Sequence, residues 1–245
     1  MAAQRPLERR AFYALKEGGW RDFVTLLHPP YTAWHLSFVA IGAGVAPTVR
    51  LDRMAWTLGG FFLGVGVCAH ALDELRGRPL NTKLPSSTLA ALATLSLAGA
   101  VAIGIYGTLT VSVTIAALVA AGLFIVLAYN LELFNGRFHT DFWFAASWGG
   151  FPALAGFWAC CQRIDAQLVL AMCACFALSL LQRRLSTPVR KLRRKTMSIE
   201  GTQLLLDGTE EPLSARGIAE PMEGALKAGA AATMLLAAAL VLARM

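Results

Sequence analysis

Charged side chains are scarce in this 245-residue chain: they make up 15% of it, whereas hydrophobic residues make up 56%. This excludes a soluble domain with an ordinary polar exterior. Apolar runs of roughly 17 to 25 residues, the length that spans a bilayer, recur along the chain. We expect an all-α, polytopic bundle of about seven transmembrane helices, at residues 31–49, 54–72, 88–106, 109–130, 142–161, 166–182 and 222–243.

Cysteine is sparse as well, and its positions argue against disulfides and metal binding. All five cysteines lie in apolar segments and lack the spacing of metal ligands: Cys68, Cys160, Cys161, Cys173 and Cys175. Buried, unreactive thiols are therefore expected. Before residue 30 no short apolar run ends in a small-residue cleavage site, so we expect no removable signal peptide.

Four parts follow from these patterns. Residues 1–30 form an N-terminal segment in which apolar and basic side chains alternate between residues 7 and 27, as in an amphipathic helix on a membrane surface. A solvated tail is the alternative. Residues 31–182 form a core of six spans, residues 183–221 a basic loop and cap, and residues 222–245 the last transmembrane helix. Within the cap, Asp207-Gly208 follows an apolar run and predicts a tight turn.

Acidic residues are outnumbered 22 to 15 by Lys and Arg, and the basic residues are unevenly placed. With seven spans, all Lys and Arg except Arg50, Arg53, Arg163 and Arg244 fall on the side of the N-terminus. Because Lys and Arg are retained in the cytoplasm, we expect an integral membrane protein whose N-terminus and large polar loops are cytoplasmic. The basic cluster at 183–195 predicts contact with anionic membrane lipids, or attraction of a polyanionic substrate, and no nucleic-acid partner.

Side chains that can bind a metal ion or transfer a proton gather where the second apolar segment ends. In a helix, spacings of three and four residues place His70, Asp73 and Glu74 on one face. Carboxylate pairs suit Mg²⁺, which takes oxygen ligands and often bridges to phosphates. Histidine ligands favour a transition metal instead. The stretch therefore predicts a metal site, with Mg²⁺ as the cofactor if the carboxylates dominate.

Three cations follow these carboxylates within ten residues: Arg76, Arg78 and Lys83. Arginine fits phosphate oxygens in a bidentate fork, so the stretch is typical of a site that binds and activates a diphosphate leaving group. A salt-bridged helix end that anchors lipid headgroups is the alternative.

Two further groups of residues can border the cavity that would contain this metal and diphosphate site. Polar residues cluster at another helix end on the cytoplasmic side: Tyr129, Asn130, Glu132, Asn135, Arg137, His139 and Asp141. The alternative is a loop in which these side chains satisfy one another's hydrogen bonds without a ligand. In the fifth segment, Gly149, Gly150, Pro152 and Gly156 interrupt an apolar run that contains Trp143 and Trp148. Such residues bend a helix and can open a lipid pocket, or they allow close packing without a ligand.

At these residues the chain resembles the UbiA superfamily of intramembrane prenyltransferases. Four stretches between residues 20 and 160 carry the resemblance, in the family's order: His28-Pro29-Pro30-Tyr31; residues 69–73 with Arg78-Pro79 and 83–86; Tyr129 with 137–140; and residues 149–156. They are similar to the family's Arg-Pro-Pro opening, its first aspartate-rich motif with the Arg-Pro-Ile-Pro-Ser-Gly stretch, its Tyr and Lys-Arg-x-Thr element, and its Gly-x-x-Pro-x-x-Gly helix.

The resemblance implies a helical bundle around a central cavity that holds a prenyl diphosphate and Mg²⁺ near the cytoplasmic side. Asp73 would be a metal ligand, Arg78 and Lys83 would contact the diphosphate, and Tyr129 and Arg137 would line the cavity. The implied partners are an isoprenoid diphosphate and a lipophilic acceptor.

The chain also departs from the family pattern. In the first motif Asp73 alone falls on a family aspartate, and the second motif, Asp-x-x-x-Asp, is replaced by Gln182-Arg183-Arg184-Leu185-Ser186. Further metal ligands can come from the loop where that motif belongs, in which Asp207, Glu210 and Glu211 repeat the spacing of three and four. Alternatively, the basic cluster that includes Arg183 and Arg184 neutralises the diphosphate directly.

Three functions remain open. The leading one is a divergent UbiA-like enzyme that binds an isoprenoid diphosphate through Mg²⁺, with Asp73, Glu74, Tyr129 and Arg137 as catalytic residues, and transfers or cyclises the prenyl group. The second is a non-catalytic membrane subunit or lipid-binding scaffold. The third is a metal enzyme that uses His70, His139 and the two carboxylates.

Overall fold

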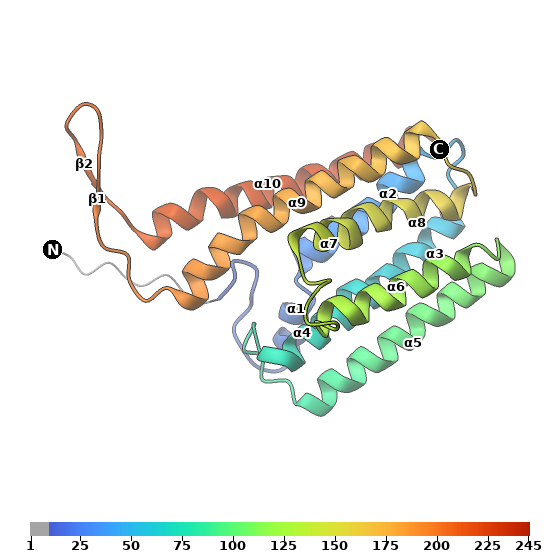
Figure 1. Cartoon of the computed structure of the whole chain (residues 1–245), viewed down its shortest axis with the longest axis horizontal. Coiled ribbons are helices and arrows are strands. Elements are labelled where there is room, and N and C mark those ends of the chain that lie inside the picture. The colour runs from blue at the N-terminus through green and yellow to red at the C-terminus, as the bar shows by residue number, and fades with distance from the viewer. Residues whose placement is uncertain (1–9) are drawn as a thin grey trace.

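The computed structural model describes residues 10–245, which form a bundle of helices with one small β-hairpin (Figure 1). In chain order the long helical segments are α2 (Pro29–Val45); α3 (Leu51–Phe61), which continues through the π-helical η1 (Phe62–Ala69) into α4 (His70–Gly77); α5 (Ser86–Thr110); α6 (Ile115–Asn130); α7 (Asp141–Ala145), which continues through the π-helical η2 (Ala146–Gly150) into α8 (Phe151–Cys160); α9 (Ala166–Lys195); and α10 (Ala215–Leu242). Each of the seven predicted apolar segments coincides with one of these, and the all-α class is confirmed.

Within residues 10–245, four helices are long and apolar enough to cross a membrane: Leu51–Gly77, Ser86–Thr110, Ala166–Lys195 and Ala215–Leu242. Helix α6 is apolar but shorter. This composition agrees with an integral membrane protein, while the seven-span topology stays a prediction.

The two ends of the bundle differ in their connections. Residues 78–85, 131–140 and 196–214 form the longer connections at one end, which we call the polar end (Figure 1). The short connections 46–50, 111–114 and 161–165 lie at the opposite end together with the C-terminus. The longer loops therefore gather around the helix ends at the polar end.

Helix α2 runs through the middle of the bundle and packs closely on α8 and α10. A side chain on Gly42 would collide with the carbonyl of Ala153, and one on Gly156 with the carbonyl of Val39. Small residues at such positions let two helices approach until their backbones touch. Close packing is thus the role of Gly156, and it supports a core that contains the fully buried Phe38.

The N-terminal segment differs from the amphipathic helix expected over residues 7–27. Residues 7–9 lie outside the described part, residues 10–19 have no regular helix, and α1 covers Trp20–Leu26 alone. Gly18 and Gly19 have φ angles of 105° and 62°, which a right-handed helix does not contain. The glycine pair therefore interrupts the expected helix at residues 18 and 19, directly before α1.

The expected basic loop at 183–221 is also different, because α9 continues to Lys195 and α10 begins at Ala215. Arginine, leucine and lysine are good helix formers, and cations at a helix C-terminus interact favourably with its dipole. Between the two helices, β1 (Thr202–Leu204) pairs with β2 (Glu210–Pro212) in an antiparallel hairpin. The predicted turn lies there, with Gly208 at a φ of 86°.

Candidate functional site

A cavity of about 400 Å³ opens at the polar end, between the N-terminal segment, α2, α4, α6, α9 and α10. All four histidines of the chain line it: His28, His35, His70 and His139. Five arginines and three carboxylates line it as well: Arg76, Arg183, Arg190, Arg193, Arg194, Asp73, Glu132 and Glu223. We call this space the polar cavity. Its lining is unusual for an apolar bundle, because ionisable groups in such a position normally face a ligand or water.

Five of the residues predicted to form the site line the polar cavity: His70, Asp73, Arg76, Tyr129 and Arg183. The Asp73 carboxylate has no hydrogen bond or ion pair within the described residues. Arg190, Arg183 and Arg76 are its cationic neighbours. Asp73 therefore stands as an unpaired carboxylate among arginines.

Glu74, which was expected to join Asp73 at a metal, faces away from the cavity. It is fully buried, and both of its carboxylate oxygens accept hydrogen bonds from the 78–85 loop. Oε1 accepts from the N–H and the O–H of Thr82 at 2.8 and 2.9 Å, and Oε2 accepts from the N–H of Leu80 at 3.0 Å. Because successive helix residues point about 100° apart, the expected single face for both carboxylates is wrong.

Arg78 and Lys83 also belong to this loop, and neither lines the polar cavity. The Arg78 guanidinium donates to the carbonyl of Leu84 at 2.6 Å and to Ser86 Oγ at 2.9 Å. The backbone N–H of Lys83 donates to Asp22 Oδ2 at 2.9 Å, and its Nζ lies 3.8 Å from a Glu17 carboxylate oxygen. Both residues hold the 78–85 loop in place. Their contact with a diphosphate stays a prediction, because neither side chain lines the polar cavity.

Arg137 and Arg184 lie on the surface. Arg137 is exposed, and Arg184 is 72% exposed, with its Nε 3.7 Å from Asp141 Oδ2. Neither residue is part of the cavity lining. Arg183, the neighbour of Arg184, is 15% exposed, and its Nε donates to Asp141 Oδ1 at 3.0 Å. One turn of α9 thus holds one inward and one outward arginine.

The three acidic residues offered as further metal ligands lie on the hairpin: Asp207, Glu210 and Glu211. The hairpin projects from the bundle (Figure 1), and all three side chains are exposed and absent from the cavity lining. The N–H of Thr209 donates to Asp207 Oδ1 and lowers the pKa of that carboxyl. Across residues 10–245, no three His, Cys, Asp or Glu side chains are grouped so that they could hold a metal ion.

The arginines of the polar cavity fall into two groups. Arg183, Arg193 and Arg76 pair with Asp141, Glu223 and Glu132, at 3.0, 2.6 and 3.3 Å. Arg190 and Arg194 have no ion pair with a carboxylate in the described part of the chain; Arg190 donates to Thr187 Oγ1 at 3.2 Å. These two guanidinium groups therefore bring uncompensated positive charge to the cavity.

The sequence pattern predicts a loop for Arg190 and Arg194 and includes them in the basic cluster that can neutralise a diphosphate, but it does not single them out as cavity residues. With residue 183 they recur at intervals of seven and four, the spacing of one helix face. This spacing would have revealed them if residues 183–195 had been treated as a helix. His35 was missed too, although it follows His28 at the same interval of seven.

Three of the four histidine rings stack on another ring of the cavity. His28 and His70 lie 4.1 Å apart between ring centroids with an interplanar angle of 17°, and Tyr129 and His139 lie 4.4 Å apart at 29°. His28 precedes α2 and sits under the N-terminal segment, where burial and the neighbouring His70 ring lower its pKa. The His28 ring is therefore neutral at pH 7, which allows the stack.

Two buried polar atoms in the lining lack a partner within residues 10–245. They are His35 Nδ1 and Tyr129 Oη, on side chains that are 6% and 5% exposed. His35 Nε2 lies 3.1 Å from Gln182 Oε1 and can donate to it, which leaves Nδ1 as an acceptor. Buried polar atoms are nearly always satisfied, so these two atoms are available to a polar ligand or water in the cavity.

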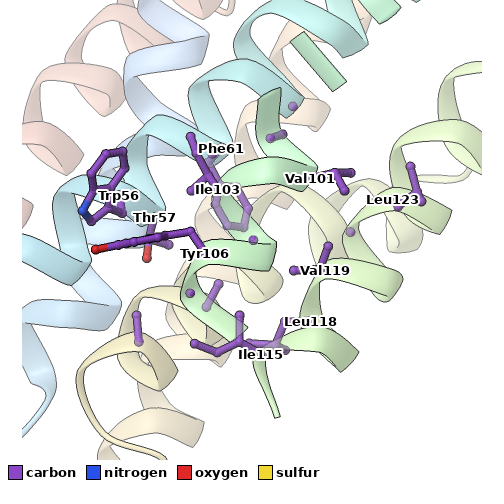
Figure 2. A pocket seen from close by; sticks show the side chains of 18 of the residues that line it. Trp56, Thr57, Phe61, Val101, Ile103, Tyr106, Ile115, Leu118, Val119 and Leu123 are labelled. Atoms are coloured by element: carbon purple, nitrogen blue, oxygen red, sulfur yellow. The ribbon is translucent and has the colours of Figure 1, made fainter. Parts of the chain in front are cut away.

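A second cavity, of about 340 Å³, lies between α3, α5, α6 and α8 (Figure 2). Most of its lining is apolar, so we call it the apolar cavity. Val65 and Trp148 line both cavities. These two buried side chains, in η1 and η2, therefore form a wall that the two cavities share.

Comparisons with protein-family models, with curated proteins and with solved structures find no match to this chain.

Proposed function

We propose that the protein is a UbiA-like membrane enzyme that binds an isoprenoid diphosphate and transfers or cyclises the prenyl group, with release of diphosphate. The observation that carries this proposal is the wall shared by the two cavities: Trp148 lines both the polar cavity, which contains the unpaired Arg190 and Arg194, and the apolar cavity. An amphiphile with an anionic head and an apolar chain matches both. On this proposal the polar end faces the cytoplasm.

The arginines supply most of the positive charge that a diphosphate needs. Arg190 and Arg194 can donate to phosphate oxygens without first giving up a carboxylate partner. Bidentate arginine contacts are among the strongest that a protein makes with phosphate. In this chain they take the place of the metal that a second aspartate motif would bind.

Mg²⁺ fits the site as an ion shared with the ligand. Asp73 offers one unpaired carboxylate, whereas Glu74 is committed to the loop. Proteins often hold Mg²⁺ through one or two carboxylates together with substrate phosphates. A bound Mg²⁺ would add charge stabilisation of the leaving diphosphate at Asp73.

In the proposed transfer, the bond between the allylic carbon and the diphosphate oxygen breaks, and its electron pair leaves with diphosphate. The acceptor gives an electron pair to the allylic carbon and loses a proton. Tyr129 and Trp148, whose rings lie 5.6 Å apart edge to face, can stabilise the positive carbon through their π faces. His35 Nδ1 is an acceptor available for the proton.

The test uses purified protein in nanodiscs, incubated with geranyl, farnesyl or geranylgeranyl diphosphate and Mg²⁺, with released diphosphate as the signal. We expect release with at least one of the three. The matched variants are Arg190→Gln, which removes an unpaired cavity arginine, and Arg184→Gln, which removes an exposed arginine of the same helix. Loss in the first and retention in the second supports the proposal, whereas no release and no binding of any chain length contradicts it.

A scaffold that binds an anionic lipid without catalysis is the second candidate. It is favoured by the single unpaired carboxylate of the cavity, because ionisation of an allylic diphosphate usually needs more metal charge than one carboxylate can hold. Farnesyl diphosphate binding that depends on Arg190, without any release of diphosphate, would identify this function. The metal enzyme based on histidines has no comparable support among residues 10–245.

A further inference from the structure

Residues 10–17 lie against the polar cavity without forming a helix or a strand, and we call this segment the strap. Figure 1 shows it as an irregular coil before α1, at the polar end of the bundle. Ala11, Phe12 and Tyr13 belong to the lining of the polar cavity. A segment of the chain itself therefore closes part of the space in which the unpaired arginines lie.

Aromatic side chains hold the strap in place. The Tyr13 ring centroid lies 5.2 Å from that of His28 and 5.4 Å from that of Tyr31. The Phe12 ring centroid lies 6.2 Å from that of Tyr31 and 5.0 Å from Nζ of Lys227, a cation–π contact with α10. Because the strap has no regular backbone structure, these side-chain contacts can separate without breaking a helix.

Tyr13 also stands beside the unpaired arginines. Arg194 and Arg190 are both charged neighbours of its hydroxyl group. Neither arginine has an ion pair with a carboxylate in the described part of the chain. Tyr13 therefore occupies space next to the two charges that an anionic ligand would use.

The strap joins α1 through two glycines with unusual backbone angles. Gly18 and Gly19 have φ angles of 105° and 62°, a region that side chains other than glycine rarely enter. A Cβ atom on either residue would meet nothing within 4 Å, so packing does not require glycine here. What the pair contributes is backbone freedom, the property of a hinge that absorbs a change of φ and ψ.

The two sides of this hinge are held very differently. Asp22 of α1 is 3% exposed, and its oxygens accept hydrogen bonds from the N–H of Gly18 at 3.0 Å and the N–H of Lys83 at 2.9 Å. On the strap, Glu17 lies 3.4 Å from Arg10 and 3.8 Å from Lys83, in exposed ion pairs that contribute little stability. The base of the hinge is thus fixed, whereas the strap is held by its aromatic contacts.

We propose that the strap is a displaceable cover of the polar cavity, which swings about Gly18 and Gly19 to admit an anionic ligand to Arg190 and Arg194. The inference rests on the proposed function for the assignment of this cavity to an anion, but it requires no prenyl transfer. In the closed state Phe12 and Tyr13 shield the cavity from water.

The experiment measures how fast a thiol in the cavity reacts with an anionic, water-soluble reagent, 2-sulfonatoethyl methanethiosulfonate, in nanodiscs. Ser186→Cys supplies the thiol, because Ser186 is 6% exposed and lines the polar cavity, whereas none of the five native cysteines does. Tyr13→Ala removes a contact of the closed strap, and a double substitution, Gly18→Ala with Gly19→Ala, strains its backbone. We expect each to raise the labelling rate by about 10-fold, the effect of one aromatic contact or of such strain on a two-state equilibrium.

Two controls separate opening of the strap from general loosening. Trp20→Ala removes an aromatic ring on the other side of the hinge, which is 67% exposed and outside the cavity lining, and should leave the Ser186→Cys rate unchanged. Met197→Cys places a thiol at a residue that is 97% exposed, and its rate should be the same with every strap variant. Should Tyr13→Ala not fold, the glycine variant still decides the question.

Inorganic diphosphate tests whether the strap covers an anion site. Ser186 and Arg190 lie one turn apart on α9 and both line the polar cavity. Diphosphate bound at Arg190 should therefore slow the labelling of Ser186→Cys in the strap variants, and adding Arg190→Gln should weaken this protection.

The outcomes distinguish this inference from the proposed function. An unchanged labelling rate in the folded strap variants, an equal rise in Trp20→Ala, or no protection by inorganic diphosphate overturns the inference. If labelling and protection behave as expected while no isoprenoid diphosphate binds or reacts, the proposed function fails and the strap remains the cover of an anion site.

Discussion

The two sides of α4 carry neighbouring carboxylates with opposite roles. Asp73 lines the polar cavity and has no partner among the described residues, whereas Glu74 is fully buried and accepts three hydrogen bonds from the 78–85 loop. The difference follows from the rotation of about 100° between adjacent helix residues. Two adjacent acidic residues on a helix therefore do not by themselves form a metal site, because their side chains point in different directions.

Helix α9 repeats this contrast with cations. Arg183 and Arg193 are held by Asp141 and Glu223, while Arg190 has no carboxylate partner within residues 10–245. Paired arginines join helices to one another, and unpaired ones are free for an anion. The polar cavity is therefore built from residues of both kinds, which single substitutions can distinguish.

Asp73→Asn should give the largest loss of activity. Removal of the unpaired carboxylate takes away the group that can hold Mg²⁺ beside the diphosphate, so release should fall by about 100-fold or more, as for other lost transition-state contacts. Thermal stability in detergent should not fall, because the carboxylate has no partner to lose. Full diphosphate release by Asp73→Asn would show that Asp73 has no role in the reaction.

Glu74→Ala should instead give the largest loss of stability. Buried donors of Leu80 and Thr82 would lose their acceptor, which should lower the free energy of unfolding by about 2 to 3 kcal/mol. Thermal unfolding in detergent, monitored as the loss of monodisperse protein, measures this loss of stability. Glu132→Ala is the control, since its carboxylate is 47% exposed; an equal loss there would contradict the buried role of Glu74.

Arg190→Gln should weaken binding more than it affects folding. One charge-assisted contact to phosphate would be lost, which corresponds to about 10-fold in the dissociation constant of farnesyl diphosphate. Titration at low and high salt checks this, because the remaining affinity should also depend less on salt. Equal affinity and equal salt dependence in the variant would place the anion away from Arg190.

The hairpin should matter least. The combined substitution of Asp207, Glu210 and Glu211 by Asn and Gln changes exposed side chains that lie outside the polar cavity. Diphosphate release should change by less than about 2-fold, as is usual for surface positions. A loss as large as that of Asp73→Asn would restore these residues as metal ligands.

Much of the fold could be predicted from local patterns. Apolar runs located every long helix, and the Asp207-Gly208 pair located the hairpin turn. The end of α9 could not be placed in this way, because a run of basic residues is typical of a loop as well as of a helix end. The helix persists to Lys195, with its arginines directed to the cavity and to Glu223.

The candidate site was predicted in part, since His70, Asp73, Arg76, Tyr129 and Arg183 do line one cavity. The roles of Glu74 and Arg78 depend on a loop that folds back over the end of α4, and no periodicity reveals such hydrogen bonds. His35 lies within an apolar helix, and its hydrogen bond with Gln182 of α9 could not be predicted because the two residues are brought together only by the tertiary structure.

The most direct test compares Asp73→Asn with Glu74→Gln in one assay: release of diphosphate from farnesyl diphosphate in nanodiscs, normalised to folded protein. Glu74→Gln keeps the shape and one acceptor oxygen of the loop contact. We expect that each folded molecule of Glu74→Gln keeps its diphosphate release and that Asp73→Asn loses it. Equal loss in both variants, or loss in Glu74→Gln alone, would contradict the division of roles between the two carboxylates.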